Sequence, residues 1–520
     1  MCFEAIVCVF HETRMKAEST RFAGYAFLID KLGLRVMPHW RVSLVSSLHR
    51  SRSSTQRDCL HVVYPRTYWP GDGIWDHLVF ALKYDGINLA LLFHIFSALD
   101  GETIRAGIHT APQSHHARRI WFLYEFLLDR QLEIPDLTRG NYIPVLDAAE
   151  YVTLSHGTRQ TRHKVLNNLP GTSAWCPTIR RTEAVRQIDS ADLEAACGTL
   201  LASYSPRLVH RALGYLYGKE TRSSFEIEHI TPSVSRVERF IGMLGIAATL
   251  DYCTHDHLIE LQNGIVDARF RERAYRRTQN YVGEFIAWQH QRVHYISPRP
   301  EDLGALMDGL LDTHARMLQS DIDAMVHAAV ISFGFVFLHP FEDGNGRMHR
   351  FLIHNILAMR GVVPAGLMFP VSATMRTHQS EYDAALEAFS KPLAQCIDFD
   401  IDAEGRLKVH NDTAAWYRFM DMTPQVEALA RFIRATIDEV LKPELDFLVR
   451  YDATRSELAN IIDMPDAHID LFIHCCFQNN GRLAKRKRTR HFPFLTSEEV
   501  EQMEAVVGRH YVHGAGGGVK

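Results

Sequence analysis

The chain has 520 residues, of which 46% are hydrophobic and 23% are charged, and its formal net charge at pH 7 is -4. This composition is typical of a globular protein long enough for several domains. The near-neutral balance argues against a chain that is basic throughout, as a nucleic-acid-coating protein would be, and against an acidic solvating tail.

Two features of the sequence bear on the cellular compartment. The nine cysteines contain no CxxC pair, which favours free thiols in a reducing environment. The first residues include Glu4 and lack a basic start and a cleavage site, so we expect no signal peptide. The longest apolar run, residues 324–338, is too short to span a bilayer and instead predicts a helix buried on all sides. We therefore expect a cytoplasmic protein without a membrane partner.

The first 218 residues divide into three predicted parts. Residues 1–24 form a weakly patterned tail, and residues 25–135 form an N-terminal helical region. Within that region, residues 77–99 predict two helices broken at Gly86, and residues 50–58 predict a polar loop. Residues 136–218 predict an irregular linker rich in Pro, Gly, Asn and Thr, followed by a helical connector.

The remaining chain predicts a regular helical core and a second helical region. The core spans residues 219–400, and its apolar periodicity predicts helices at 235–250, 257–267, 300–318, 324–338 and 345–361. Between the second and third of these, β-branched and aromatic residues at 279–298 predict a short hairpin. Residues 401–520 predict a C-terminal helical region that carries a basic loop, "GRLAKRKRTRHF".

The segment "HPFEDGNGRMHR", residues 339–350, has the least ordinary composition in the chain. Pro340 disfavours helix at His339, so the buried helix must end there, and the next helix begins near Asn345. The segment is therefore a tight loop that leads into a helix N-terminus. Gly344 and Gly346 allow the backbone to come close to a ligand, and the free amides there favour an anion.

The charged residues of this loop suggest a phosphate site. Arg347 and Arg350 are three positions apart, so they share one helix face and can both bind phosphate oxygens. Beside phosphates, Asp343 is best explained as a Mg²⁺ ligand. His339 stands at the loop entrance, where it can act as a base. The alternative is a capped helix with a surface histidine and two solvated arginines.

These residues carry a family resemblance. The segment resembles the complete Fic signature, HxFx[DE]GNGRxxR, and the order of helices and hairpin fits over roughly residues 219–400. The resemblance implies a mainly α protein, with a multi-helix core, a short β-hairpin flap, and helical N- and C-terminal regions. It implies transfer of AMP from the substrate ATP, with Mg²⁺ as cofactor, to a Ser, Thr or Tyr hydroxyl of a target protein or of the enzyme itself.

The resemblance also assigns roles by position. His339 would deprotonate the target hydroxyl, and Asp343 would hold Mg²⁺ between the α- and β-phosphates. The anion hole and the contacts to the outer phosphates would come from Gly344, Asn345, Gly346, Arg347 and Arg350. Family members that phosphorylate carry a lysine where this chain has Gly346, which favours nucleotidyl transfer.

A second stretch, "SSFEIEH", resembles the inhibitory motif [ST]xxxE[GN] of the same family. Ser224 and Glu228 match its spacing, whereas His229 stands where Gly or Asn is expected. A Glu228 carboxylate that reached Arg350 would occupy the place of the γ-phosphate. The alternative is a capped, acid-rich helix start.

Other interpretations stay open at this point. The core could be a nucleotide-sensing regulatory or binding module, or an enzyme that uses another donor such as UTP or removes AMP. The run "KRKRTR" could contact nucleic acid, but a solvated loop is the favoured interpretation. Tyr382 could line an adenine pocket, although a core position is favoured. A homodimer is compatible with the helical flanks.

Overall fold

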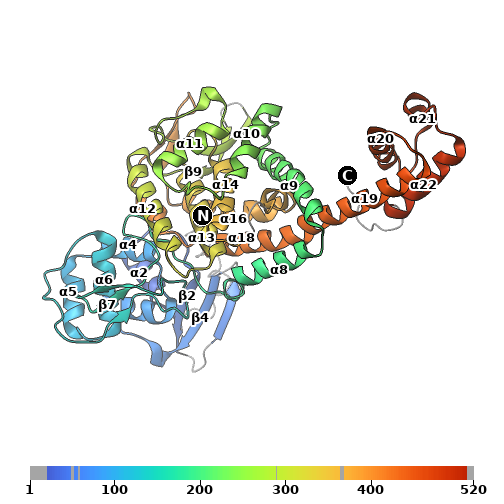
Figure 1. The fold of residues 1–520 in the computed structure, drawn as a ribbon. Coiled ribbons are helices and arrows are strands. Elements are labelled where there is room, and N and C mark those ends of the chain that lie inside the picture. Colours follow the sequence, from blue (N-terminus) through green and yellow to red (C-terminus); the bar gives the residue numbers. More distant parts are fainter. Residues whose placement is uncertain (1–19, 48–51, 57–58, 288–289, 364–367, 512–520) are drawn as a thin grey trace.

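The computed structural model describes residues 20–47, 52–56, 59–287, 290–363 and 368–511. The fold is mainly α, as predicted, with short sheets at its periphery. Figure 1 shows a blue N-terminal lobe, a central helical body and a red C-terminal module at the far end of a long helix. Within the described residues, no helix is both long and apolar enough to cross a membrane.

The N-terminal lobe contains a four-stranded sheet that the sequence analysis missed. Its order is β1-β2-β4-β3, with β2 and β4 parallel and the two outer pairs antiparallel. The strands are β1 (Thr20–Ala23), β2 (Arg41–Ser46), β3 (Arg52–Gln56) and β4 (Cys59–Pro65). The prediction of a polar loop at 50–58 is therefore wrong for residues 52–56, which form β3. Residues 52–55 are exposed, so this edge strand shows no hydrophobic alternation.

Helices complete the lobe, and the predicted break between two of them is confirmed. Gly86 has φ 94°, which ends the first helical stretch before the second begins. The helices are α2 (Tyr25–Leu32), α3 (Ile74–Phe80), α4 (Leu89–Ser97), α5 (Gly101–Thr110) and α6 (His115–Leu128), with a 3-10 turn at Arg66–Tyr68 and a π-helical turn at Ala81–Asp85.

The segment predicted as a linker is packed against the body instead. Trp175 is fully buried, and its carbonyl accepts a hydrogen bond from Thr313 Oγ1 at 3.0 Å. The Cys176 amide donates to the Arg418 carbonyl at 2.7 Å. The segment lacks periodicity because it is fixed by such long-range backbone contacts. Its elements are β5 (Ile143–Pro144), β6 (Thr158–Gln160), β7 (Val165–Asn167) and α7 (Glu183–Arg186).

The body surrounds one central helix, α13 (Ala324–Leu338), whose bounds match the prediction. All but one of its residues are buried, because three helices pack around it: α12 (Pro300–Leu318), α14 (Asn345–Met359) and α18 (Thr423–Thr436). The body contains α8 (Ser190–Ala202), α9 (Pro206–Ile227), α10 (Val234–Gly245), α11 (His255–Ile265), a 3-10 turn (Ala268–Phe270), β8 (Tyr281–Ala287), β9 (His290–Ile296), α12 (Pro300–Leu318), α14 (Asn345–Met359), α15 (Val371–Thr377) and α16 (Gln379–Ala394).

The C-terminal region is divided between the body and a separate module. The hairpin β10 (Phe399–Ile401) and β11 (Leu407–Val409), together with α17 (Ala414–Arg418) and α18 (Thr423–Thr436), belongs to the body, so the predicted boundary at 401 does not separate two units. A π-helical turn (Ile437–Leu441) leads to α19 (Lys442–Ile461), α20 (Asp466–Phe477), α21 (Lys485–His491) and α22 (Ser497–Tyr511).

This C-terminal module has its own hydrophobic core, formed by residues between Leu458 and Val507. The predicted basic loop is wrong in part, because Lys485–His491 form the helix α21. Lysine and arginine are good helix formers, and buried Leu483 and Phe492 hold the two ends of this segment on the core.

Candidate active site

The candidate site is built on the loop between α13 and α14. His339 caps α13 in the left-handed region with φ 50°, and Gly344 precedes α14 with φ 96°. Asn345 holds the loop closed, since its Oδ1 accepts from the Phe341 amide at 3.1 Å and its Nδ2 donates to the Phe341 carbonyl at 2.6 Å. Phe341 is fully buried. Both polar atoms of the Asn345 side chain are used to shape the loop. The groups of the loop that can bind an anion are therefore the free backbone amides at the start of α14.

Arg276 supports the same loop from outside and was missed by the sequence analysis. Its Nε donates to the His339 carbonyl at 2.8 Å, its amide to the Pro340 carbonyl at 2.8 Å, and its Nη2 to the Pro298 carbonyl at 2.7 Å. Arg276 is buried, and apart from the bond from its Nη1 to the nearby Thr278 carbonyl, its partners are distant in sequence. No local pattern in the chain could have distinguished it from neighbouring surface arginines.

His339 is arranged as a neutral base. Its Nδ1 lies 3.2 Å from the Val336 carbonyl, which favours the proton on Nδ1 and leaves the lone pair on Nε2. Desolvation lowers the pKa of His339 to about 4, and the nearby Arg276 guanidinium acts in the same direction. The imidazole is therefore uncharged at neutral pH and can accept a proton.

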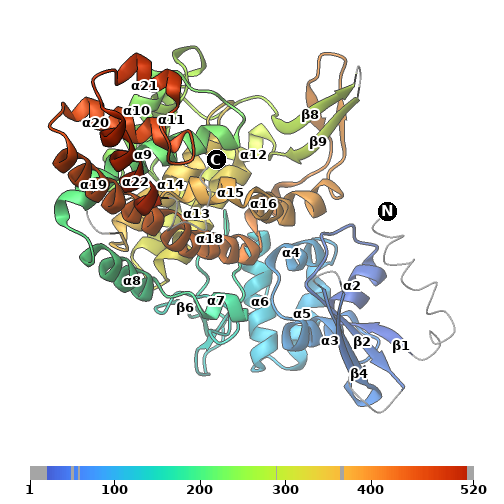
Figure 2. The same cartoon turned by 90° about the vertical axis from the view of Figure 1, so that its right-hand side faces the viewer.

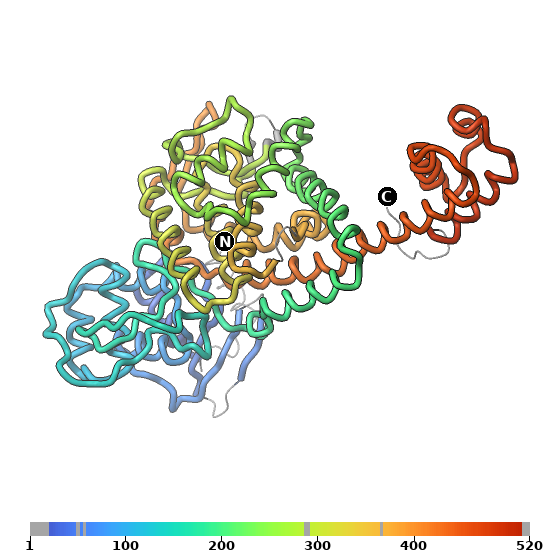
Figure 3. Tube along the Cα trace, in the orientation of Figure 1, coloured from blue at the N-terminus to red at the C-terminus, as the bar shows by residue number. Residues whose placement is uncertain are grey.

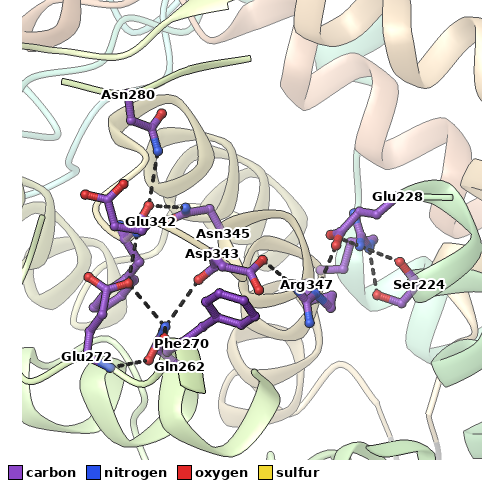
Figure 4. A network of polar contacts seen from close by, with 12 residues as sticks. Ser224, Glu228, Gln262, Phe270, Glu272, Asn280, Glu342, Asp343, Asn345 and Arg347 are labelled. Atoms are coloured by element: carbon purple, nitrogen blue, oxygen red, sulfur yellow. Dashed lines mark hydrogen bonds and ion pairs between the residues drawn. The ribbon is translucent and has the colours of Figure 1, made fainter. Parts of the chain in front are cut away.

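Arg347 and Arg350 both contact the carboxylate of Glu228, and Figure 4 shows the Arg347 side of this contact. Arg347 Nε donates to Glu228 Oε2 at 2.9 Å, and Arg350 Nη2 donates to Glu228 Oε1 at 2.7 Å. Arg350 also donates from Nε to Ser224 Oγ at 2.8 Å and from Nη2 to the Ser224 carbonyl at 2.6 Å. The predicted contact between Glu228 and Arg350 is present, and the contact to Arg347 was not foreseen.

The backbone at Gly346 allows this approach. A Cβ at residue 346 would lie 2.5 Å from Glu228 Oε1, so any larger residue would displace the carboxylate or the loop. Both guanidinium groups are buried, with exposed side-chain fractions of 0% for Arg347 and 2% for Arg350. Arg347 Nη1 is buried without a hydrogen-bond partner among the described residues. An unsatisfied cationic donor of this kind fits a site that accepts an anion.

Asp343 has the exposure and the neighbours expected of a cation ligand. Its side chain is 40% exposed, and Oδ1 accepts from Arg347 Nη2 at 2.6 Å. The Glu272 carboxylate accepts from the Glu342 amide at 2.9 Å. Burial raises the pKa of Glu272, and the Glu342 and Asp343 carboxylates add to the rise. Asp343 is thus the carboxylate of this loop that could hold a hard divalent cation together with phosphate oxygens.

The segment that resembles the inhibitory motif forms the C-terminal end of α9 rather than a helix start. Its amides close the helix, with His229 donating to the Glu226 carbonyl and Ile230 to the Phe225 carbonyl, both at 3.0 Å. This Schellman arrangement places His229 in the left-handed region with φ 56°. Glycine and asparagine are the residues that tolerate such a position best. His229 thus differs from the motif at a position whose left-handed backbone is unfavourable for a residue with a large side chain.

Helix α9 is attached to α14 over two further turns. Glu220, which is 1% exposed, accepts from His354 Nε2 at 2.8 Å and from the Ser372 amide at 2.8 Å. Positions 220, 224 and 228 are four residues apart and therefore share one face of α9. This face contacts α14 at three positions. Glu220 bonds to His354 and Ser224 to Arg350, and Glu228 bonds to both Arg350 and Arg347. These bonds from Glu220, Ser224 and Glu228 to α14 form a row, called here the polar seam, that holds Glu228 at the site.

Two other expectations concern the surroundings of the loop. The hairpin of β8 and β9 is present as predicted and stands out from the body in Figure 2. Its Asn280 Nδ2 donates to the Phe341 carbonyl at 3.4 Å, which places the hairpin base beside the loop. Tyr382 is buried and hydrogen-bonds to Arg350, in agreement with the favoured core interpretation.

Comparisons with known proteins find similarity over the part of the chain that contains this loop. Residues 252–357 match the model of the Fic/DOC family. The chain is 26% identical over 197 residues to a protein adenylyltransferase Fic of Nematostella vectensis, covering 35% of this chain and 44% of that protein. A protein of the same name from Culex quinquefasciatus is 28% identical over 179 residues, with 31% and 32% covered. The chain therefore spans less than half the length of these relatives.

A solved structure of a Fic family protein from Desulfovibrio desulfuricans G20 is 18% identical to this chain, with a TM-score of 0.36. The alignment covers 65% of this chain and 90% of that one.

Proposed function

Since this chain contains a Fic/DOC family domain at residues 252–357, we propose that it is a protein adenylyltransferase. It transfers AMP from ATP to a Ser, Thr or Tyr hydroxyl of a target protein, or of its own chain. The observation that carries the proposal is the convergence of a neutral histidine, a helix N-terminus and two buried arginines on one loop. These are the groups that phosphoryl chemistry needs for positioning and charge neutralisation.

The reaction requires a base and an in-line attack. The target hydroxyl oxygen attacks the α-phosphorus of ATP and forms a new phosphoester bond. The bond from the α-phosphorus to the bridging oxygen breaks, and pyrophosphate leaves with the electron pair. The hydroxyl proton passes to Nε2 of His339, whose Nδ1 is engaged by the Val336 carbonyl. The low pKa of His339, about 4, keeps this nitrogen unprotonated at neutral pH.

The negative charge of the nucleotide is met by three kinds of group. Amides at the start of α14 face the phosphate nearest the base, and Arg347 and Arg350 bind the outer phosphates. Asp343 would hold Mg²⁺, and the half-exposed carboxylate leaves room for phosphate and water ligands. The ion would supply charge neutralisation for the leaving pyrophosphate.

The same geometry supports a second part of the proposal, which is restraint by Glu228. The outer phosphates require the two arginine side chains that Glu228 now engages. A carboxylate between them also repels the phosphate electrostatically. ATP therefore binds weakly, or with its α-phosphate misaligned, until the Glu228 side chain withdraws. The seam through Glu220 and Ser224 disfavours that withdrawal because it fixes α9 against α14.

A labelling experiment tests the chemistry. The full chain carrying Glu228→Gly is incubated with Mg²⁺ and with ATP labelled at either the α- or the γ-phosphate, so that the restraint does not mask activity. We expect protein-bound label from the α position only, and none when His339→Ala is added to the same background. Label from the γ position would mean phosphorylation. If nucleotide binds but neither label is transferred, to this chain or to added cell extract, the sensing module is the correct interpretation.

A further inference from the structure

The C-terminal module carries a concentration of positive charge that AMP transfer does not use. Residues 471–497 contain six Lys and Arg residues and no Asp or Glu, although the whole chain is slightly acidic. Five of the six lie on α21, which has seven residues. The six are Arg482, Lys485, Arg486, Lys487, Arg488 and Arg490.

These cations have no carboxylate partner among the described residues. Lys487 donates to Gln478 Oε1, and Arg488 donates to Ser497 Oγ at 3.1 Å, so their partners are neutral. Two acids that follow the segment bond to amides and not to these cations: Glu504 accepts from the Leu483 amide at 2.8 Å, and Glu499 accepts from the Thr496 amide at 2.7 Å. Adjacent like charges repel, and a helix that concentrates them is stabilised by an external anion.

The structure also anchors the basic helix at both ends and leaves it accessible. None of the α21 residues is buried, whereas Leu483 before it is 7% exposed and Phe492 after it is 0% exposed. Phe492 packs edge-on against Phe472 of α20, with ring centroids 5.5 Å apart. The tube in Figure 3 shows the module well separated from the body beyond the end of α19. The cations are therefore presented on a fixed frame away from the candidate active site.

We infer that the C-terminal module, residues 458–511, binds double-stranded DNA through α21. A duplex offers closely spaced phosphates along two strands, which match several cations held on one short helix. Its major groove is wide enough to admit a helix, whereas the narrow major groove of A-form RNA is not. The expected binding is mainly to phosphates, so it should depend strongly on salt and only weakly on sequence.

Other polyanions fit the segment less well. Single-stranded nucleic acids bind to aromatic stacking platforms, and within the described part of 471–497 only Phe494, at 49%, is a strongly exposed aromatic residue. Anionic membranes bind helices that bury an apolar face, and α21, with the sequence KRKRTRH, has no apolar residue. The duplex is the polyanion that needs neither feature.

The test measures the salt dependence of binding by the full chain. Fluorescence anisotropy is recorded with a labelled duplex of mixed sequence and about 20 base pairs, at about 50 and 200 mM salt. With about four phosphates neutralised, wild-type affinity should fall about 100-fold between these concentrations. The variant with Lys485, Arg486, Arg488 and Arg490 all replaced by Gln should bind at least about 10-fold more weakly at low salt and show a flatter salt dependence.

Matched controls separate a specific site from general charge. The control variant replaces four exposed cations outside the module, Lys31, Arg52, Arg66 and Lys408, by Gln and should bind like wild type. Gln keeps helix propensity similar to that of Lys and Arg, and circular dichroism checks that both variants are folded. If the module variant does not fold, the milder pair Arg486→Gln with Arg490→Gln is measured instead.

Four results would overturn the inference. They are no binding by wild type at low salt, an equal loss in the control variant, tighter binding to single-stranded DNA or to an RNA hairpin than to the duplex, and equally strong binding to a polyglutamate peptide. The last of these would assign α21 to an acidic protein partner.

Discussion

Replacing Glu228 by glycine is the change that most directly tests the proposed restraint of this site. The carboxylate bridges Arg347 Nε and Arg350 Nη2 at 2.9 and 2.7 Å, and both arginines are almost fully buried. The substitution removes the charge and the side chain together, so both guanidinium groups become available to phosphate oxygens. We expect AMP transfer to rise, whereas loss of an ordinary surface acid would leave it unchanged.

The magnitude follows from the bonds that ATP must replace. A hydrogen bond between charged groups contributes about 1.5–3 kcal/mol. Each arginine also keeps a second partner, because Arg350 binds Ser224 and Arg347 binds Asp343. Because these second partners remain in the variant, the proposed restraint by Glu228 contributes about the free energy of one such hydrogen bond. Since about 1.4 kcal/mol corresponds to a factor of ten, its removal should raise the rate about 10- to 100-fold.

The assay is the initial rate of automodification with α-labelled ATP at subsaturating concentration. The matched control is Glu226→Gly, which removes an acid two positions away whose partner is the exposed Arg376. Arg350→Ala should not reproduce the gain, because the nucleotide needs that arginine. Equal rates for wild type and Glu228→Gly, or an equal rise in the Glu226 control, would refute the proposed restraint.

Four other predictions concern the site and the segment that carries Glu228. His339→Ala should lower transfer about 10²- to 10⁴-fold while nucleotide binding, measured by calorimetry, is retained. Because the pKa of His339 is about 4, the rate should stay level from neutral pH to about pH 5 and fall below that; a fall centred near pH 6.5 would contradict the assignment. Asp343→Ala should weaken Mg²⁺-dependent nucleotide binding and transfer together, so an unchanged Mg²⁺ titration would exclude it as ligand. His229→Gly should relieve about 1 kcal/mol of left-handed strain, raise the melting temperature and lower basal transfer, whereas His210→Gly inside α9 should destabilise.

Prediction from sequence succeeded where structure follows from a short stretch of chain. The apolar run at 324–338 has no polar face, so it had to become a helix buried on all sides, and α13 has these bounds. It failed where neighbouring residues carry no periodic signal. The exposed strand β3 and the packed segment around Trp175 both depend on partners elsewhere in the chain. The basic stretch was expected as a loop because its anchors, Leu483 and Phe492, lie outside it.

The sequence by itself determined the chemistry available at the loop. His339, Asp343, Arg347 and Arg350 lie within twelve residues, and Pro340 and Gly344 end one helix and start the next through local backbone preferences. Only the tertiary structure decided what these groups contact. Glu228 meets Arg347 across 119 residues, and Arg276 meets His339 across 63. Such pairs depend on how α9 and the segment around 276 pack on α14, and packing is a property of the whole core.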